Sequence, residues 1–265
     1  MWTEALGIGI GTWAAGLGVV AAAQRRLIFK PPVRVRRLPP GPAAGGFRIE
    51  PLTLRVAPGV TLEGWRSLPL DGLAPRATLL YFGGRGENAA WAPHMSGYLH
   101  GWSVLAFNYR GFGASLGRAT EAVVCADALR IHDHCIGDAP AAIMGRSLGT
   151  AVAIRLAAAV PAQALVLVSP FDSLGAIAAA NPLLAPGVPL LRHRFDTRAQ
   201  APQVRCPTLV LLARGDRRVP RRHSLALLQR LGTAAQLVEI DGQTHRSLPR
   251  SVVAQQAIAA FLAPD

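Results

Sequence analysis

The 265-residue chain contains few acidic, aromatic and cysteine residues, and Lys30 is its only lysine. Against 15 Asp and Glu residues stand 28 Lys and Arg residues, so the net charge of +13 is carried almost wholly by arginine. Proteins that bind nucleic acid combine such charge with a basic stripe, interleaved aromatic residues or a known motif. Here aromatic residues make up 6% and the arginines are dispersed, so we expect no nucleic-acid partner.

The three cysteines, Cys125, Cys135 and Cys206, are an odd number without the spacing of metal ligands. Such cysteines are typical of buried free thiols and do not form a disulfide framework. The pattern therefore predicts neither a zinc site nor a small disulfide-stabilised fold.

Charge is also absent from residues 5–23, near the N-terminus. As a helix, these 19 residues would span roughly 28 Å, about the thickness of the hydrocarbon core of a bilayer. We therefore predict that residues 1–26 form a single-pass membrane anchor. Two alternatives stay open. One is a cleaved signal peptide that ends at the small residues 21–23, although no basic residue precedes the apolar run. The other is a buried amphipathic helix.

A dense group of basic residues follows the uncharged segment, beginning at Arg25 and ending at Arg37. The positive-inside rule places this flank and the globular part in the cytoplasm, whereas cleavage of a signal peptide would export the globular part. The flank also favours attraction to an anionic membrane surface. Residues 27–46 are rich in proline and glycine, which predicts an extended tether before a globular domain over residues 47–265.

The globular part is long enough for one α/β domain, and it alternates apolar strand candidates with helix candidates. Continuous apolar strands separated by helices are typical of a parallel sheet covered on both faces. We predict an α/β fold with a mostly parallel sheet of about eight strands, helices on both faces and an antiparallel pair at the start. The strand candidates are residues 47–56, 60–67, 77–82, 103–107, 141–144, 164–169, 208–213 and 235–240, and the helix candidates are residues 88–100, 120–135, 148–159, 222–231 and 251–262.

A G-x-S-x-G pentapeptide, residues 145–149, lies between a strand candidate and a helix candidate. This context is the one that a nucleophile elbow requires, because Gly145 and Gly149 permit a sharp turn and a close approach of strand and helix. Ser147 would stand at the top of the turn. We predict that it is a nucleophile.

A serine hydroxyl is a poor nucleophile at neutral pH and needs a base that an acid orients. Folds with this elbow carry the three groups in the chain order serine, acid, histidine, each after a strand. Asp216 follows strand candidate 208–213 and His245 follows strand candidate 235–240. The order predicts a Ser147, Asp216, His245 triad, with Asp172 as the alternative acid because it follows strand candidate 164–169.

The reaction of such a serine passes through an oxyanion that two preorganised donors must stabilise. One predicted donor is the backbone amide of Leu148, directly after the serine. The other should come from the glycine-rich loop at residues 83–87, where the amide of Arg85 is the candidate. The loop lacks the lysine and the glycine spacing of phosphate-binding loops, so we expect no nucleotide cofactor.

These segments together resemble the α/β-hydrolase superfamily, and most of all its membrane-anchored branch with protein depalmitoylases and lysophospholipase-like members. The resemblance covers roughly residues 77–247 and rests most specifically on two segments, Asn-Tyr-Arg-Gly-Phe-Gly at 108–113 and Gly-Arg-Ser-Leu-Gly at 145–149. It implies that Ser147 is the nucleophile, Asp216 the acid and His245 the base.

One departure from the family concerns the oxyanion loop, where His-Gly-Asn is usual and this chain has Gly83, Gly84 and Arg85. Backbone donors do not depend on side chains, so we expect the oxyanion hole to survive this change. Two hypotheses follow: the missing histidine loosens the loop, and Arg85 favours an anionic substrate. The insertion between strand candidates 164–169 and 208–213 is only about 38 residues long and contains an apolar stretch at 183–191. It predicts a small apolar cap suited to an acyl substrate, unless its leucines pack in the core.

The sequence thus predicts a serine hydrolase that cleaves an ester or thioester through an acyl-enzyme, without a metal or organic cofactor. The expected partners are a small or acylated substrate and, through the N-terminal segment, a membrane. Two alternatives stay open: a serine peptidase on the same scaffold, and a membrane-tethered binding protein without catalytic activity.

Overall fold

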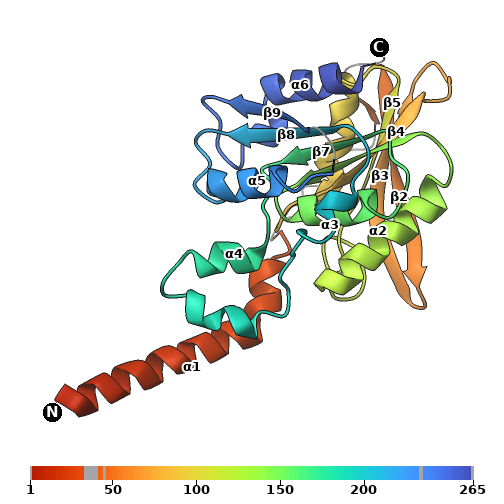
Figure 1. Ribbon diagram of the computed structural model, residues 1–265. Helices are drawn as coiled ribbons and strands as arrows, with labels where there is room; N and C mark the ends of the chain where they lie inside the picture. The colour runs from red at the N-terminus through yellow and green to blue at the C-terminus, as the bar shows by residue number, and fades with distance from the viewer. Residues whose placement is uncertain (1, 33–40, 44–45, 233–234, 264–265) are drawn as a thin grey trace.

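The strand segments pair into one sheet of nine strands in the order β1-β2-β3-β5-β4-β6-β7-β8-β9 (Figure 1). The computed structural model describes residues 2–32, 41–43, 46–232 and 235–263, without the side chains of residues 2–12, 14 and 41–43. Pairing is antiparallel from β1 to β5 and parallel from β5 to β9. This confirms the predicted α/β-hydrolase fold with its mostly parallel sheet.

The strands and helices lie close to their predicted bounds. The strands are β1 (Gly41–Ala43), β2 (Phe47–Ala57), β3 (Val60–Pro69), β4 (Ala77–Phe82), β5 (Trp102–Phe107), β6 (Ala141–Arg146), β7 (Ala164–Val168), β8 (Thr208–Ala213) and β9 (Ala235–Ile240). The α-helices are α1 (Trp2–Ile28), α2 (Glu121–Cys135), α3 (Leu148–Ala157), α4 (Leu174–Ala179), α5 (Arg221–Leu228) and α6 (Val252–Leu262), and the longer 3-10 segments are η1 (Ala89–Gly97) and η2 (Ala185–Leu190).

Both faces of the sheet carry an apolar core, because side chains alternate between the faces along each strand. In β4, Leu80 and Phe82 join a core that contains residues of α2, α3 and α5. Leu79 and Tyr81, from the same strand, join a second core that contains residues of η1 and α6 (Figure 1). The sheet is therefore covered on both faces, as its continuous apolar strands predict.

One predicted helix takes a different form. The candidate at residues 88–100 is the 3-10 segment η1, which contains Pro93. A proline in the interior of an α-helix removes a backbone donor and clashes with the preceding turn, so the tighter, shorter form is the accessible one.

The N-terminal residues form α1, which extends away from the sheet (Figure 1). Among the described residues, no helix is long and apolar enough to cross a membrane. The predicted anchor over residues 1–26 is therefore not confirmed, and half of its side chains lie outside the described residues. Much of the predicted tether, at residues 33–40 and 44–45, also lies outside them.

The last turns of α1 pack against the insertion that follows β7. Gln24 is buried, and its side chain donates to the carbonyl of Leu190 and accepts from the amides of Arg192 and His193. Phe29 is buried next to the ring of His193. The end of α1 therefore belongs to the globular body, which begins before residue 26, inside the segment predicted to be the anchor.

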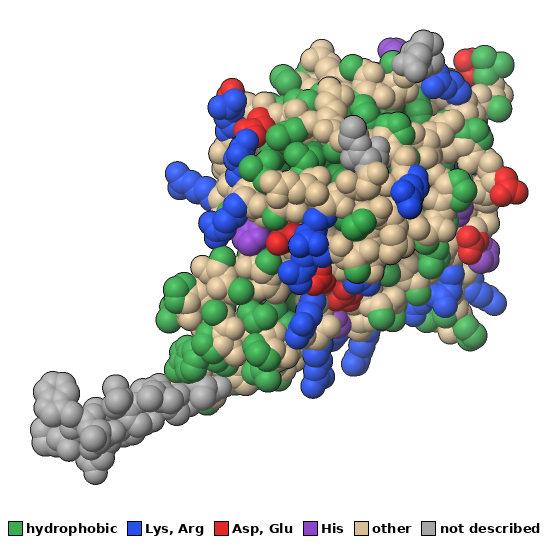
Figure 2. All heavy atoms as spheres, viewed as in Figure 1, with side chains coloured by type: hydrophobic (Ala, Val, Ile, Leu, Met, Phe, Trp, Pro, Cys, Tyr) green, Lys and Arg blue, Asp and Glu red, His purple; other side chains and the backbone are tan. Residues whose placement is uncertain are grey.

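The insertion forms the small cap, with α4 and η2 beside α1 (Figure 1). Its leucines do not pack in the core, because Leu183 is 70% exposed and Leu190 50% exposed. Figure 2 shows apolar side chains gathered on the cap next to α1. The alternative that the leucines at 183–191 are core residues is thus wrong for Leu183 and Leu190.

Candidate active site

Ser147 lies at the turn between β6 and α3, in a backbone conformation rare for a side-chain-bearing residue. Its φ is 50° and its ψ is −117°, and its amide donates to the carbonyl of Val168 at 2.8 Å. The flanking glycines leave no room for a side chain. A Cβ on Gly145 would lie 2.4 Å from the carbonyl oxygen of Gly149, and a Cβ on Gly149 would lie 2.1 Å from that of Phe82. The turn therefore needs both glycines and presents the serine.

A chain of hydrogen bonds joins Ser147, His245 and Asp216, which come from three different loops. His245 Nε2 lies 3.0 Å from Ser147 Oγ, and His245 Nδ1 lies 2.7 Å from Asp216 Oδ2. The imidazole and the carboxylate are almost fully buried, and Ser147 is half-buried. The structure thus brings together the three residues that the sequence singles out, in an order that lets a proton move from the hydroxyl to the imidazole.

The environment of Asp216 keeps its carboxylate charged. Burial raises the pKa of the carboxyl group, but the hydrogen bond with His245 and those from the amides of Val219 and Arg218 outweigh it and lower the pKa to about 2. The carboxylate is therefore ionised at every pH at which such a histidine can act as a base.

Asp172, the alternative acid, has a different histidine as its partner. Its Oδ1 lies 3.0 Å from Nδ1 of His223, in α5, and accepts from the amide of Ser173. Both side chains are buried. This second Asp–His pair connects the end of β7 to α5. The Asp172 carboxylate is therefore already bound to His223 and does not contact His245.

The glycine-rich loop after β4 lies against the nucleophile turn. The amides of Gly86 and Glu87 donate to the carbonyl of Gly84, at 2.9 and 3.3 Å, which folds the loop tightly. Among the hydrogen bonds of the described residues, none uses the amide of Arg85 as a donor. Leu148 is the first residue of α3, where a helix leaves its amides without an internal acceptor. The two predicted oxyanion donors are thus both available to a ligand.

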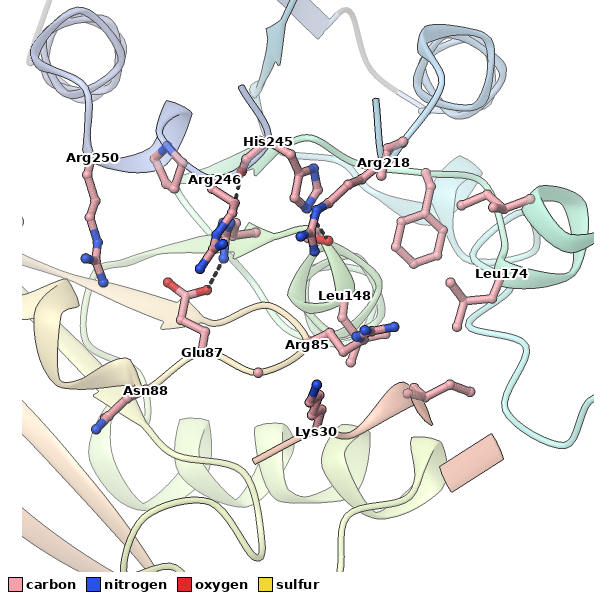
Figure 3. A pocket seen from close by; sticks show the side chains of 18 residues that line it. Lys30, Arg85, Glu87, Asn88, Leu148, Leu174, Arg218, His245, Arg246 and Arg250 are labelled. Carbon is pink, nitrogen blue, oxygen red and sulfur yellow. Dashed lines mark hydrogen bonds and ion pairs between the residues drawn. The ribbon is translucent and has the colours of Figure 1, made fainter. Parts of the chain in front are cut away.

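Glu87 fixes the position of this loop, a role that the sequence alone does not predict. Its Oε2 accepts from the amide of Gly84 at 2.7 Å and from Arg146 Nη1 at 2.8 Å, and its Oε1 accepts from the hydroxyl of Tyr81 and from the indole of Trp91. Arg146 Nη2 donates in turn to the carbonyl of His245 at 2.9 Å (Figure 3). One ion pair therefore connects the glycine-rich loop, the nucleophile turn and the histidine loop.

The electrostatics of this pair favour its charged form. Burial raises the pKa of the Glu87 carboxyl, but the Arg146 guanidinium and the hydrogen bonds to Gly84 and Trp91 hold it below its ordinary value. A buried carboxylate with four donors is a rigid anchor, because each of its oxygens is satisfied. Glu87 therefore fixes the position of the glycine-rich loop, in which the family's histidine is missing.

A cavity of about 790 Å³ opens in front of Ser147. Apolar side chains line part of it, with Phe171 after β7, Leu174 and Ile177 from α4, and Ile28 at the end of α1. Its charged lining is almost entirely basic, with Glu87 as the one acidic residue among the described residues, and Figure 3 shows basic side chains entering from several segments.

Across the described part of the chain, no group of three or more His, Cys, Asp or Glu side chains is arranged to hold a metal ion.

Family models and relatives agree with this architecture. A family model described as serine aminopeptidase, S33 matches residues 74–187, and one described as TAP-like protein matches residues 189–264. An uncharacterized protein of Mycobacterium tuberculosis is 32% identical over 233 residues, which are 84% of this chain and 80% of that protein. The lysophosphatidylserine lipase ABHD12 of Mus musculus is 33% identical over 141 residues, 45% of this chain and 35% of the lipase.

Solved structures share the fold. An esterase of Pyrococcus furiosus superposes with a TM-score of 0.64 at 20% identity, over 89% of this chain and 97% of the esterase. The mouse α/β hydrolase domain-containing protein 10 superposes with a TM-score of 0.66 at 19% identity, over 80% of this chain and 96% of that protein. With the sheet order, the strand-end positions of the site and the family models, these similarities show that the chain belongs to the α/β-hydrolase superfamily.

Proposed function

We propose that this protein is a serine hydrolase that cleaves carboxylic esters or thioesters through an acyl-enzyme. The observation that carries the proposal is the hydrogen-bonded series from Ser147 through His245 to Asp216 at the wall of an open cavity. Relatives and structural neighbours that are named as a lipase and an esterase support the ester as the scissile group.

In the first step, Ser147 Oγ attacks the acyl carbon while His245 Nε2 accepts the hydroxyl proton. Asp216 holds the imidazole by its Nδ1–H and stabilises the imidazolium that forms. The tetrahedral intermediate collapses when the C–O or C–S bond to the leaving group breaks, and His245 gives its proton to the departing oxygen or sulfur. Water then repeats the sequence on the acyl-enzyme and releases the carboxylic acid.

Two backbone amides stabilise the negative oxygen of both tetrahedral intermediates. The amide of Leu148 points from the start of α3, where the helix dipole adds a favourable field. The amide of Arg85 is the second donor, and its place depends on the Glu87–Arg146 pair below the loop. Such donors are worth most when they are rigid before the reaction begins.

Glu87 is therefore a positioning residue, and we expect Glu87→Gln to lower kcat about 10- to 100-fold with little change in KM. The amide of glutamine replaces one accepting oxygen with an NH₂ group that faces other donors, and it removes the charge that holds Arg146. The oxyanion loop therefore loses its fixed position. The loss of one oxyanion donor costs about 10²-fold or more in kcat. Steady-state kinetics of the purified variant measure both constants.

Glu121→Gln is the matched control for this variant. Glu121 is also a buried carboxylate paired with an arginine, since Arg155 Nη2 lies 2.5 Å from its Oε1. Among the described residues, no hydrogen bond joins these two side chains to the glycine-rich loop or to His245. We expect its kcat to stay close to that of the parent. Equal losses of kcat in the two variants would contradict a positioning role for Glu87.

The substrate that fits the cavity best carries an acyl chain. Phe171, Leu174 and Ile177 offer an apolar wall on the cap side of Ser147. A peptidase that recognises a free amino terminus needs an acidic side chain for the ammonium group. Among the described residues that line the cavity, Glu87 is the only acid, and it is already bound to Arg146. The cavity thus favours an acyl ester or thioester over a peptide, although one matching family model is named for an aminopeptidase.

Turnover of graded substrates tests this choice. We expect p-nitrophenyl esters and acyl-thioesters to be hydrolysed with a kcat/KM that rises with chain length until the apolar wall is filled, and aminoacyl anilides to be poor substrates. A series in which the anilides exceed the esters in kcat/KM would contradict the proposal.

We also propose that the enzyme works at a membrane, on the cytoplasmic side, with its N-terminal segment as the attachment. Nineteen uncharged residues at 5–23, the basic residues that follow them and the exposed Val19 and Leu27 on α1 support attachment. We expect the full chain to sediment with membranes and to stay there in high salt. Quantitative recovery in the supernatant at low salt would refute it.

A further inference from the structure

Basic side chains dominate the cavity in front of Ser147. The described residues of its lining include one acid, Glu87, and six cations, Lys30, Arg85, Arg146, Arg218, Arg246 and Arg250. Glu87 is committed to Arg146, so no carboxylate of the lining remains for the other five. Among the described residues, none of these five forms an ion pair, and Arg250 instead lies over the ring of Trp91. The cavity therefore carries a concentrated positive charge.

Three of these cations, from three different segments, line the same cavity as Ser147. Figure 3 shows the ends of Lys30 and Arg218 turned toward the middle of the cavity and the guanidinium of Arg85 turned toward the side of Leu174, with Arg250 on the opposite side. Like charges gathered in one cleft repel each other, and a cleft lined by one sign of charge concentrates ligands of the opposite sign. This arrangement favours a bound anion.

The backbone holds each of the three cations next to the groups that we propose for the reaction. The amide of Arg218 donates to Asp216 Oδ1 at 2.8 Å. Arg85 belongs to the loop that Glu87 anchors. The carbonyl of Lys30 lies against that loop, because a Cβ on Gly86 would be 2.9 Å from its oxygen, and Gly86 has a φ of +134°. An anion held by these side chains would therefore lie in the same cavity as Ser147.

The chemistry of the three cations suits a phosphate group. Two guanidinium groups offer forked pairs of N–H donors, and charge-assisted hydrogen bonds of this kind match phosphate oxygens well. Lys30 adds a compact ammonium with three donors, and it is the single lysine of a chain whose other basic residues are all arginine. Beside this cationic part lies the apolar wall formed by Ile28, Phe171, Leu174 and Ile177.

We propose that Lys30, Arg85 and Arg218 form a subsite for a phosphate group on the leaving-group half of the substrate, so that the enzyme selects acyl esters whose leaving group carries a phosphate. The inference rests on the proposed hydrolysis at Ser147. It assigns the acyl chain to the apolar wall and the phosphate to the three cations.

Two substrates with the same short acyl chain, which keeps both monomeric, test the subsite. One is a monoacylglycerol, which is neutral, and the other is the corresponding monoacylglycerol phosphate. We expect kcat/KM to be at least about tenfold higher for the phosphate ester at low ionic strength, mainly through KM, and the ratio to fall toward one as salt screens the charges. Glycerol phosphate should compete better than inorganic phosphate, which separates a head-group site from a general anion site.

The variants are Lys30→Gln, Lys30→Glu and Arg218→Gln, with Arg55→Gln as the control. Arg55 is exposed on β2, is absent from the cavity lining, and its replacement removes the same charge. We expect the ratio of the two kcat/KM values to fall about tenfold in Lys30→Gln, further in Lys30→Glu, and not at all in Arg55→Gln. Because Lys30 is the only lysine, acetylation of the folded enzyme should lower the ratio in the parent and leave Lys30→Gln unaffected.

A parent ratio near one, or a ratio that the Lys30 and Arg218 variants leave unchanged, would overturn the subsite. In that case, the proposed function would still be supported if the parent enzyme hydrolyses the neutral ester and Ser147→Ala does not. Hydrolysis of both esters that persists in Ser147→Ala would instead overturn the proposed function itself. The two failures are therefore distinguishable.

Discussion

Ser147→Ala is expected to lower kcat/KM for ester hydrolysis by about 10⁴- to 10⁶-fold, the range typical of a serine nucleophile that works together with a histidine. Without Oγ there is no acyl-enzyme, and His245 has no hydroxyl from which to take a proton. The oxyanion donors and the cavity would sustain only a slow attack by water. Steady-state rates of the purified variant, with circular dichroism to show that it is folded, measure the loss.

Ser169→Ala is a matched control for the conformation of the backbone. Ser169 also has a φ of 50°, follows a strand of the same sheet and is buried, but its hydroxyl makes no hydrogen bond to any described residue and is absent from the cavity lining. We expect its kcat/KM to stay within about threefold of the parent, since the chemistry does not use it. A comparable loss in both variants would mean that strain in the backbone, rather than the nucleophile, explains the effect.

Asp216→Asn is expected to lower kcat by about 10⁴-fold with little effect on KM. The amide that replaces the carboxylate carries no charge to stabilise the imidazolium, and it favours the wrong tautomer of His245. The same substitution at Asp172 removes the carboxylate charge beside His223, so we expect it to lower the unfolding temperature while kcat changes less than about tenfold. Rates and melting curves of the two variants, recorded side by side, measure both effects.

The opposite pattern would reassign the acid. If Asp172→Asn loses the activity and Asp216→Asn retains it, the histidine must exchange partners when substrate binds, and the resting hydrogen bond of 2.7 Å between His245 and Asp216 is not the productive one. A double variant adds a further check, because two residues that act through one histidine lose activity less than additively.

The sheet was predictable because its strands are buried on both faces and are therefore apolar without interruption. Segments such as 77–82, 164–169 and 208–213 match β4, β7 and β8 within a residue. The positions of Ser147, Asp216 and His245 were also predictable, since the carboxyl ends of neighbouring parallel strands meet at one edge of the sheet. The short strand β1 and the 3-10 form of η1 were not, because a three-residue strand carries no pattern and a proline inside an apolar run changes the type of helix.

Contacts between residues that are far apart along the chain could not be predicted from the sequence. Glu87 and Arg146 are 59 residues apart, and Asp172 and His223 are 51 apart. Gln24 reaches Arg192 across 168 residues. The one signal in the sequence for the first pair was a lone acid in the loop that lacks the family's histidine, together with the arginine inside the G-x-S-x-G turn. These opposite charges predict an ion pair only once the sheet order is known, because the sheet order shows that the two segments meet at the same edge of the sheet.

Covalent labelling with a fluorophosphonate probe tests the central claim most directly, because the probe reacts only with a serine that its neighbours activate. Digestion and mass spectrometry of the labelled full-length protein should place one adduct on Ser147. The adduct should be absent from Ser147→Ala, strongly reduced in His245→Ala, and fully present in Ser169→Ala. Labelling that persists in Ser147→Ala, or that maps to another serine, would contradict the account.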